Sequence, residues 1–230
     1  FNARYGVHIT REDIIRPYDR AIGTDGSIAI LKGNLAPEGA VIKHTACPKE
    51  MYKAVLRARP FDSEEECLAA VLHHEVQKGD AVFIRYEGPK GSGMPEMFYT
   101  SEAISSDKEL GRSIAFITDG RFSGASTGPV IGHCSPEAVD GGPIALVEQD
   151  DLIEIDVFAR KLNIVGVQGQ RKTPAEIDAI LAERRAKWQP KPRKYTRGVL
   201  RLFSELAASP MKGAYIDYKD RAPPTASPSH

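Results

Sequence analysis

Residues 113–128 read SIAFITDGRFSGASTG, an apolar run that leads directly into a polar, glycine-rich loop. The run at 113–117 predicts a buried strand. The eleven residues after it, 118–128, hold three glycines, two serines, two threonines, an aspartate and an arginine. A plain reversal of the chain needs only a few of them. Loops held by rigid strands are common places for binding and catalytic residues.

A second loop of the same kind follows the predicted strand at 81–86. It reads EGPKGSGMP over residues 87–95 and ends at one carboxylate, Glu96. We expect a helix over 96–106, with Pro95 where the first turn of a helix accepts proline. The chain therefore has two glycine-rich loops, and each delivers one polar residue, Ser123 or Glu96, from the end of a strand.

The remaining pattern is mostly short strands. Strands are predicted at 27–31, 40–42, 130–133, 143–147, 152–157 and 162–167, separated by Gly- and Pro-containing loops. Helices are predicted from Ser63 to about 79, from Thr173 onward and over 198–208, the first two from capping-box spacings. Many short strands, few helices before residue 170 and no strict strand–helix alternation favour an α/β fold with a barrel-like or layered sheet over a doubly wound sheet.

The composition is that of a globular protein, with 41% hydrophobic and 27% charged residues in 230. Its 31 basic and 31 acidic residues cancel, so no overall field favours nucleic acid, membrane or acidic ligands. Between Arg171 and Arg201, however, ten basic residues face three acidic ones, a net charge of +7. We interpret this basic segment as a solvated helix face; binding of nucleic acid or of a partner is the alternative.

The three cysteines form no CxxC pair, which favours a reducing compartment over a disulfide framework. No apolar run approaches the ~20 residues that a membrane helix needs, and no signal peptide opens the chain. We therefore expect a cytoplasmic protein with no membrane or nucleic-acid partner. Because the first residue is Phe1 rather than Met, we also expect a piece of a longer protein.

Ser123 has a functional and a structural interpretation. A serine hydroxyl needs an activating neighbour and fixed donors before it acts as base or nucleophile. Gly120 and Gly124 would turn backbone N–H groups inward or admit a substrate close to the backbone. The hydrolase elbow G-x-S-x-G fails, because Ser123 comes one residue too late, and no Gly-Lys-Ser/Thr follows for a phosphate loop. A glycine-rich turn with solvated hydroxyls is the alternative.

Glu96 and His133 are also open to two interpretations. Glu96 is either a first-turn carboxylate that interacts with a helix dipole or one oxygen ligand of a hard cation such as Mg²⁺. His133 stands beside Cys134, which is the beginning of a soft-metal pair, but no second pair exists. A histidine that packs in the core or supports another residue fits better.

Four stretches together resemble one enzyme family. They are GNLAPEGAVIK (33–43), RYEGPKGSGMPEM (85–97), ITDGRFSGASTGPVIGHCSPEA (117–138) and GGPIALV (141–147). In this order they resemble the C-terminal domain of the dihydroxy-acid dehydratase and 6-phosphogluconate dehydratase family, over about residues 20 to 215. The stretch FYTSEAI (98–104) is more similar to the aldonic-acid, xylonate-type branch than to the branched-chain biosynthetic enzymes.

The resemblance implies a fold and an organisation. It implies a β-barrel-like swivelling β/β/α domain over 26–215, with the barrel to about 170 and a helical C-terminal extension after it. Residues 1–25 would be a linker or docking segment from an N-terminal domain, and 216–230 a flexible tail.

The resemblance also implies cofactors and residue roles. Family members use Mg²⁺ and an iron–sulfur cluster, whose ligands are expected mainly in the N-terminal domain. Ser123 matches the base that removes the C2 proton, and Glu96 matches a Mg²⁺ ligand. Arg121, Ser126 and Thr127 are candidates for holding the substrate. No cluster role is carried over to the three cysteines Cys47, Cys67 and Cys134.

The resulting expectation is the C-terminal half of a sugar-acid dehydratase, a hydro-lyase that converts an aldonic acid such as xylonate into a 2-keto-3-deoxy acid. The isolated chain would be inactive, its partners would be the small-molecule sugar acid and its own N-terminal domain, and the enzyme would be a homo-oligomer. Two alternatives stay open: a branched-chain dihydroxy-acid dehydratase, and a non-catalytic module that binds small anions.

Overall fold

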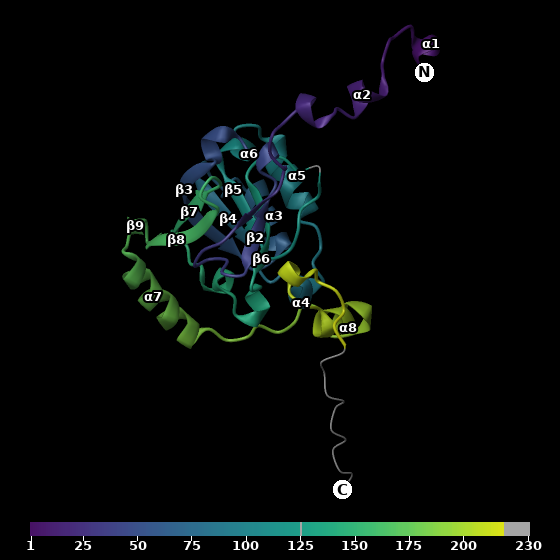
Figure 1. Ribbon diagram of the computed structural model, residues 1–230. Coiled ribbons are helices and arrows are strands. Elements are labelled where there is room, and N and C mark those ends of the chain that lie inside the picture. The colour runs from purple at the N-terminus through teal and green to yellow at the C-terminus, as the bar shows by residue number, and fades with distance from the viewer. Residues whose placement is uncertain (125, 219–230) are drawn as a thin grey trace.

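A single curled sheet forms the body of the protein in the computed structural model, which describes residues 1–124 and 126–218 (Figure 1). Within these residues the strands are β1 (Ala29–Leu31), β2 (Gly39–Ile42), β3 (Lys53–Phe61), β4 (Asp80–Ile84), β5 (Ala115–Thr118), β6 (Val130–Ser135), β7 (Leu152–Asp156), β8 (Lys161–Val167) and β9 (Gln170–Arg171). Their order in the sheet is β1-β2-β6-β5-β4-β3-β7-β8-β9. The four strands β3, β4, β5 and β6 run parallel to one another, and the other pairings are antiparallel.

The sheet curls until β1 meets β8. Lys32, directly after β1, pairs with Lys161, and the Leu162 N–H donates to the Lys32 carbonyl at 3.0 Å. The Asn34 side chain extends this contact, because its Oδ1 accepts from the Ile164 N–H at 2.7 Å and its Nδ2 donates to the Ile164 carbonyl at 2.9 Å. The expected α/β fold with a barrel-like sheet is confirmed.

Short helices surround the sheet. The α-helices of the described residues are α1 (Asn2–Tyr5), α2 (Arg11–Ile14), α3 (Glu64–Leu72), α4 (Pro89–Ser92), α5 (Phe98–Ser106), α6 (Leu110–Ser113), α7 (Pro174–Lys187) and α8 (Gly198–Leu206). The 3-10 helices are η1 (Tyr18–Arg20), η2 (His44–Ala46), η3 (Lys49–Met51), η4 (Ala138–Asp140), η5 (Pro143–Leu146) and η6 (Pro210–Lys212). None of the described helices has the length and apolar character to span a bilayer.

The parallel strands have a core on each face. Along β4, Ala81 and Phe83 point into the main core inside the curl, while Val82 and Ile84 point into a second cluster under α3, α5 and α6. All four side chains are fully buried. Burial on both faces explains why β4 and β5 read as continuous apolar runs rather than as alternating patterns.

Two helix starts follow the predicted capping residues. Ser63 caps α3, since its Oγ accepts from the Glu66 N–H at 3.2 Å. Thr173 and Glu176 form a complete capping box at α7, with Pro174 in the first turn. Side-chain acceptors at these positions satisfy backbone N–H groups that have no partner within the helix.

Three local predictions were wrong. The nine-residue strand β3 was not predicted, although it lies near the middle of the sheet. The strand expected at 143–147 is the 3-10 helix η5, which begins at Pro143; proline has no N–H for a ladder bond. The helix expected from Glu96 begins at Phe98, so Glu96 lies outside it.

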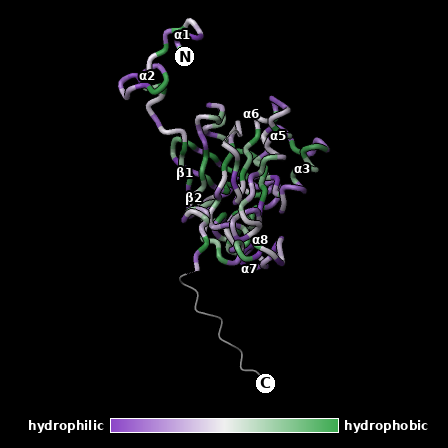
Figure 2. Tube along the Cα trace, turned by 90° about the vertical axis from the view of Figure 1, so that its right-hand side faces the viewer, coloured by the Kyte–Doolittle hydropathy of each residue, from purple (hydrophilic) through white to green (hydrophobic). Residues whose placement is uncertain are grey.

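The N-terminal segment extends away from the body. Residues 1–25 contain α1, α2 and η1, none of which has a buried residue. In Figures 1 and 2 the segment stands apart from the curled sheet. Its interpretation as a linker or docking segment stays a prediction. Most of the tail expected at 216–230 lies outside the described residues.

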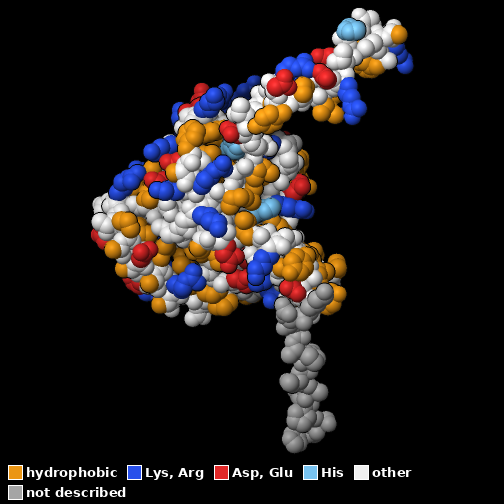
Figure 3. Space-filling view, in the orientation of Figure 1, with side chains coloured by type: hydrophobic (Ala, Val, Ile, Leu, Met, Phe, Trp, Pro, Cys, Tyr) orange, Lys and Arg blue, Asp and Glu red, His pale blue; other side chains and the backbone are white. Residues whose placement is uncertain are grey.

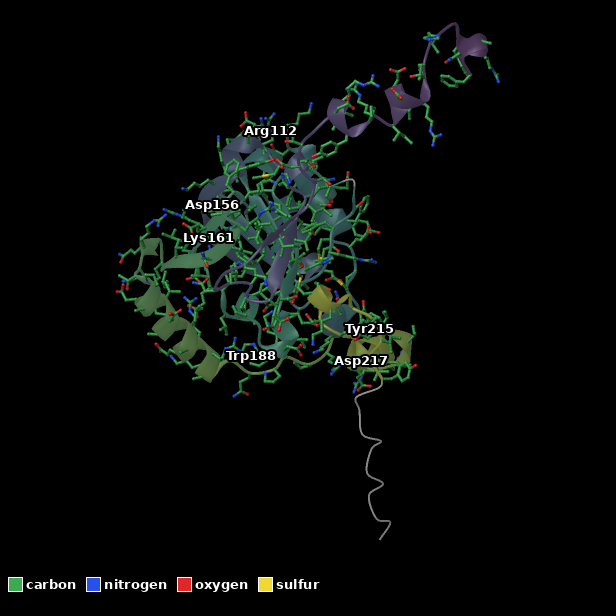
Figure 4. All side chains as sticks on the ribbon, in the orientation of Figure 1. Arg112, Asp156, Lys161, Trp188, Tyr215 and Asp217 are labelled. Atoms are coloured by element: carbon green, nitrogen blue, oxygen red, sulfur yellow. The ribbon has the colours of Figure 1, made fainter. Side chains whose placement is uncertain are left out.

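The basic segment at 171–201 lies against the body and pairs with its carboxylates. Arg184 contacts Asp151, Lys191 contacts Asp62, and Lys194 contacts Glu65 and Glu87. Trp188, labelled below α7 in Figure 4, donates from its indole N–H to the Tyr86 hydroxyl at 3.3 Å. On the face seen in Figure 3, side chains of both charges are accordingly intermixed. The segment is therefore more than a solvated helix face, because part of its charge is used within the fold.

Candidate active site

The sheet topology explains the length of the loop between β5 and β6. These two strands are parallel neighbours, with Phe116 opposite Val130 and Ile117 opposite Ile131. A parallel neighbour cannot be reached by a tight turn, because the chain must first return along the length of the strand. Residues 119–129 make that return without a described helix. We call this segment the crossover loop.

Backbone bonds hold the crossover loop against its neighbours. The Gly120 carbonyl accepts from the His133 N–H of β6 at 2.9 Å, and the Gly128 N–H donates to the Ala46 carbonyl of η2 at 3.0 Å. Between these points, the Ser126 N–H donates to the Ser123 carbonyl at 3.1 Å and forms a turn. The loop is therefore supported at its beginning and at its end.

The two glycine-rich loops lie side by side. Glu96 and Arg121 form an isolated parallel bridge, and the Met97 N–H donates to the Arg121 carbonyl at 2.9 Å. This bridge places Glu96 beside the crossover loop, two residues from Ser123 along that loop. Glu96 is exposed and precedes Met97, the N-cap of α5, so it lies outside the first turn of that helix.

Ser123 lies in a small pocket. It is half-buried and lines a cavity of about 180 Å³ together with Lys43, Gly124, Gly132 and His133. The Lys43 ammonium, which comes from the end of β2, donates to the Gly124 carbonyl. The hydroxyl, an ammonium and an imidazole therefore share one cavity.

The two glycines that flank Ser123 serve different purposes. A Cβ on Gly120 would lie 2.9 Å from the Glu87 carbonyl oxygen, so Gly120 permits the close packing of the two loops. A Cβ on Gly124 would meet nothing within 4 Å among the described residues. The expectation that both glycines admit substrate therefore fits the open surroundings of Gly124 and not those of Gly120.

His133 contributes to the pocket but does not form a metal pair with Cys134. It has a left-handed backbone, with φ of 58°, which is unusual for a residue with a side chain. Burial and the nearby Arg121 charge lower the pKa of its imidazole. Cys134 is fully buried in the main core, where burial raises the pKa of its thiol. His133 thus lines the pocket, while Cys134 packs in the core.

Asp119 joins the loops that follow three parallel strands. It is completely buried, and its carboxylate accepts from the N–H groups of Tyr86 at 3.2 Å, Glu87 at 3.0 Å and Ala138 at 2.8 Å. Burial raises the pKa of Asp119 to about 6, although the three hydrogen bonds oppose the shift. We did not predict this role, because an aspartate before a glycine is also typical of an ordinary turn.

Glu137 and Glu87 are buried beside Asp119. Glu137 accepts from the backbone N–H of Lys90 at 3.0 Å and that of Gly91 at 3.0 Å. Burial, with Asp119 nearby, raises the pKa of Glu137 to about 8. Glu87 accepts from the Lys194 ammonium at 3.0 Å. Asp119, Glu137 and Glu87 lie at the carboxyl ends of β5, β6 and β4. Asp119 and Glu137 accept hydrogen bonds from backbone N–H groups of the loop that follows β4.

The three residues expected to hold substrate are not brought to one cavity. Arg121 is exposed, and its backbone forms the isolated bridge with that of Glu96. Ser126 is buried, and its Oγ has no hydrogen-bond partner among the described residues. Thr127 is exposed and lines a different pocket, of about 410 Å³, on the side of η2 and α6. Their assignment as substrate-binding residues stays a prediction.

The residues suit the two expected cofactors differently. The exposed Glu96 carboxylate, next to the Ser123 pocket, is the kind of ligand that Mg²⁺ takes together with water and substrate. The three cysteines are all buried, and burial raises the pKa of each thiol, in the case of Cys47 to about 12. Iron–sulfur clusters bind thiolates. Within the described part of the chain, no group of three or more His, Cys, Asp or Glu side chains is arranged to hold a metal.

These features define a class of protein: an α/β domain whose candidate polar site lies on loops from a set of parallel strands. The chain belongs to the dihydroxy-acid/6-phosphogluconate dehydratase C-terminal family, whose family model matches residues 13–214. The resemblance expected from the four sequence stretches is thereby confirmed at the level of the family.

Three curated relatives of high similarity share the name dihydroxy-acid dehydratase. A dihydroxy-acid dehydratase of Agathobacter rectalis is 48% identical over 205 residues, which cover 89% of this chain and 35% of the relative. One of Nitrosospira multiformis is 49% identical over 209 residues, covering 90% and 35%. One of Ignicoccus hospitalis is 44% identical over 218 residues, covering 94% and 37%. The chain thus spans about a third of the length of these relatives.

Proposed function

We propose that this chain is the C-terminal part of a dihydroxy-acid dehydratase, which removes water from a 2,3-dihydroxy acid to give a 2-keto acid. The observation that carries the proposal is the backbone bridge between Glu96 and Arg121, which brings the backbone of Glu96, the candidate metal ligand, beside the loop that presents Ser123. Family membership and the names of the relatives support the reaction class.

Ser123 would act as the base. Its alkoxide would take the C2 proton as the C3–O bond breaks, the departing hydroxide would take that proton from the serine hydroxyl and leave as water, and the resulting enol would become the 2-keto acid. Proton removal next to a carboxylate builds negative charge, which fixed donors and cations must stabilise. The Lys43 ammonium in the same pocket supplies one positive charge from this chain.

Glu96 would hold Mg²⁺. When bound, this cation supplies Lewis-acid stabilisation of the charge that develops on substrate oxygens. A single carboxylate does not make a magnesium site, so the proposal requires further oxygen ligands from water, from the substrate or from other parts of the enzyme. The Glu96–Arg121 bridge keeps the carboxylate at the loop junction.

An iron–sulfur cluster does not fit the cysteines of this chain. Cys47 and Cys134 belong to the main core and Cys67 to the cluster under α3, and all three are buried. If the whole enzyme holds a cluster, its thiolate ligands belong to other parts of the protein.

The names of the relatives favour the branched-chain alternative over the sugar-acid interpretation. The stretch at 98–104 had pointed to sugar acids. In the structure it forms most of α5, where Thr100, Ser101 and Ile104 are buried and Tyr99 is 70% exposed. Helix packing is thus sufficient to constrain much of this stretch, and its sequence is weak evidence for a substrate.

Substrate profiling of the full-length enzyme tests the proposal. We expect purified, anaerobically handled protein to form a 2-keto acid from a branched 2,3-dihydroxy acid with a kcat/KM well above that for xylonate. A clear preference for xylonate would restore the sugar-acid interpretation. Failure to turn over either substrate, with small anions still bound, would favour the non-catalytic binding module.

A further inference from the structure

We propose that Lys43 is a positioning residue for Ser123: its ammonium holds the carbonyl of the next residue, Gly124, and keeps a positive charge beside the serine hydroxyl. The inference rests on the proposed function, because it assigns Lys43 a part in the action of Ser123 as base. It adds a residue from β2, a strand outside the two glycine-rich loops.

The position of Lys43 is fixed by the sheet. Lys43 follows Ile42, the last residue of β2, and Ile42 pairs with Ile131 of β6. Ile42 and Ile131 are both completely buried. The backbone from which the lysine side chain extends is therefore anchored in the core, and the side chain reaches the crossover loop from a rigid base.

Lys43 differs from the other supports of the crossover loop. The bonds to the carbonyls of Gly120 and Arg121 and from the N–H of Gly128 each join one backbone group to another. The bond at Gly124 is made by the Lys43 side chain, directly after the candidate base. This anchor acts at the carbonyl of Gly124, the residue after Ser123, and so restricts the backbone close to the serine.

The Lys43 charge is not neutralised by a carboxylate. Among residues 1–124 and 126–218, its ammonium takes part in no ion pair and donates to a neutral carbonyl. Lys43 also lines the cavity of about 180 Å³ that Ser123 lines. A nearby cation favours the anionic form of an acidic group, here the serine alkoxide.

A purely structural lysine is the competing explanation. It would bond to the Gly124 carbonyl, lend some stability to the loop and have no influence on proton transfer. The two explanations differ in the pH dependence of the reaction, because only a charge that acts on Ser123 changes the pH at which the base becomes active.

The experiment compares three variants in the full-length enzyme. Lys43→Met keeps much of the length and removes the charge, Lys43→Arg keeps the charge, and Lys78→Met removes an exposed lysine elsewhere as the matched control. Each is assayed for kcat and KM across pH with a 2,3-dihydroxy acid. Amide hydrogen exchange of the peptide that covers residues 119–129 is measured in parallel.

For Lys43→Met we expect kcat to fall about tenfold to a hundredfold, in the range typical of a misplaced catalytic group. The limb of the kcat profile that rises with pH should move to higher pH, KM should change less than kcat, and the loop amides should exchange faster. Lys43→Arg should recover most of the activity and the original pH profile. Lys78→Met should behave as wild type.

The inference is overturned if Lys43→Met keeps the wild-type kcat and pH profile, whether or not loop exchange accelerates. It is also overturned if Lys43→Arg is as impaired as Lys43→Met with the same shifted profile. A Ser123→Ala variant in the same series distinguishes failure of the proposed role of Ser123 from failure of the role of Lys43. If it keeps its activity, the proposed role of Ser123 fails; if it is inactive while Lys43→Met is normal, only the role of Lys43 fails.

Discussion

Asp119 shows how a single buried carboxylate organises a site. Its two oxygens accept three backbone N–H groups from segments that follow β4 and β6, while Asp119 itself follows β5. Hydrogen bonds to a charged acceptor are stronger than those between neutral groups. Asp119 therefore fixes the relative positions of the loops that carry Glu96 and Ser123.

The raised pKa values of Asp119 and Glu137 predict a stability that falls as the pH rises. Burial raises the folded-state pKa of Glu137 to about 8 and that of Asp119 to about 6, above their ordinary values of 4.5 and 3.8. The folded state then binds more protons than the unfolded state between about pH 4 and pH 8. The stabilising contribution is full below the unfolded pKa values and is lost as the pH rises through the folded ones.

We therefore expect Glu137→Gln, which resembles the protonated carboxyl, to reduce this dependence. Between pH 5 and pH 8, both proteins should lose unfolding free energy, as measured with urea. The loss should be smaller in the variant than in wild type, by about 1 kcal/mol or more. Exposed Asp178→Asn is the control, with no change in slope. Equal slopes for Glu137→Gln and wild type would show that Glu137 is ionised at pH 5 in the folded state.

Glu96 is best tested through the metal. In the full-length enzyme, Glu96→Gln keeps the side-chain shape but removes a charged ligand, so turnover should fall and added Mg²⁺ should recover part of it. Titration of Mg²⁺ against activity measures the effect. The control is Glu102→Gln, which changes an exposed glutamate of α5. Superimposable curves for wild type and Glu96→Gln would rule out the ligand role.

The residues that could be predicted from sequence are those that carry a recognisable motif. Ser123 and Glu96 were assigned by resemblance, and the structure places their loops together. Lys43, Asp119 and Glu137 were not assigned, because their roles depend on contacts between segments far apart in the chain. A local pattern does not show which carboxylate will be buried.

Among the secondary-structure elements, β3 was not predicted for the same reason: its local pattern does not show the contacts it makes. Its sequence, KAVLRARPF, mixes three cationic residues and a proline into the apolar pattern. The structure uses this mixture: Arg59 pairs with Asp80 at 2.8 Å, and Pro60 lies beyond residues 53–57, which pair with β7. Pro60 therefore has β4 as its sheet neighbour on one side only. Tertiary contacts override the weak local signal.

The basic segment offers a comparison between a buried and an exposed ion pair. Lys194 contacts Glu87, whose side chain is 1% exposed, whereas Lys191 contacts Asp62, whose side chain is 24% exposed. Removing the partner of a buried charge is costly, while surface pairs contribute little. Since the Lys194 side chain is itself 33% exposed, solvent screening reduces its effect.

We expect Lys194→Met to lower the unfolding free energy by about 1–3 kcal/mol and the matched Lys191→Met to lower it by less than about 1 kcal/mol. Denaturant unfolding of the isolated chain at neutral pH measures both. Equal losses would mean that the pairing with buried Glu87 has no special importance for stability.

For the whole molecule, the curled sheet is complete while the candidate metal site is not. The barrel-like sheet closes between β1 and β8 and has its own core. We therefore expect the isolated chain to fold. We also expect it to bind no iron–sulfur cluster, because its three cysteines are all buried. Anaerobic reconstitution with iron and sulfide, followed by visible absorption, checks this. Stoichiometric iron and sulfide on the folded chain would contradict it.

The fold class could be predicted from the number and spacing of short apolar runs, and the family from four motifs. The parallel arrangement of β3 to β6 could not, because the crossover between β5 and β6 contains no described helix to signal it. The same crossover explains the glycine-rich loop that precedes β6: its length returns the chain along the sheet, and it carries Ser123, which lines the candidate site.

The role of Ser123 as base is tested most directly by turnover of the full-length enzyme on a 2,3-dihydroxy acid, comparing wild type, Ser123→Ala and the exposed-surface control Ser106→Ala. Ser123→Ala should reduce kcat by at least ~10²-fold, as expected for a positioned acid–base group, with an unchanged unfolding transition. A Ser123→Ala enzyme that keeps more than half of the wild-type kcat would show that another group removes the C2 proton.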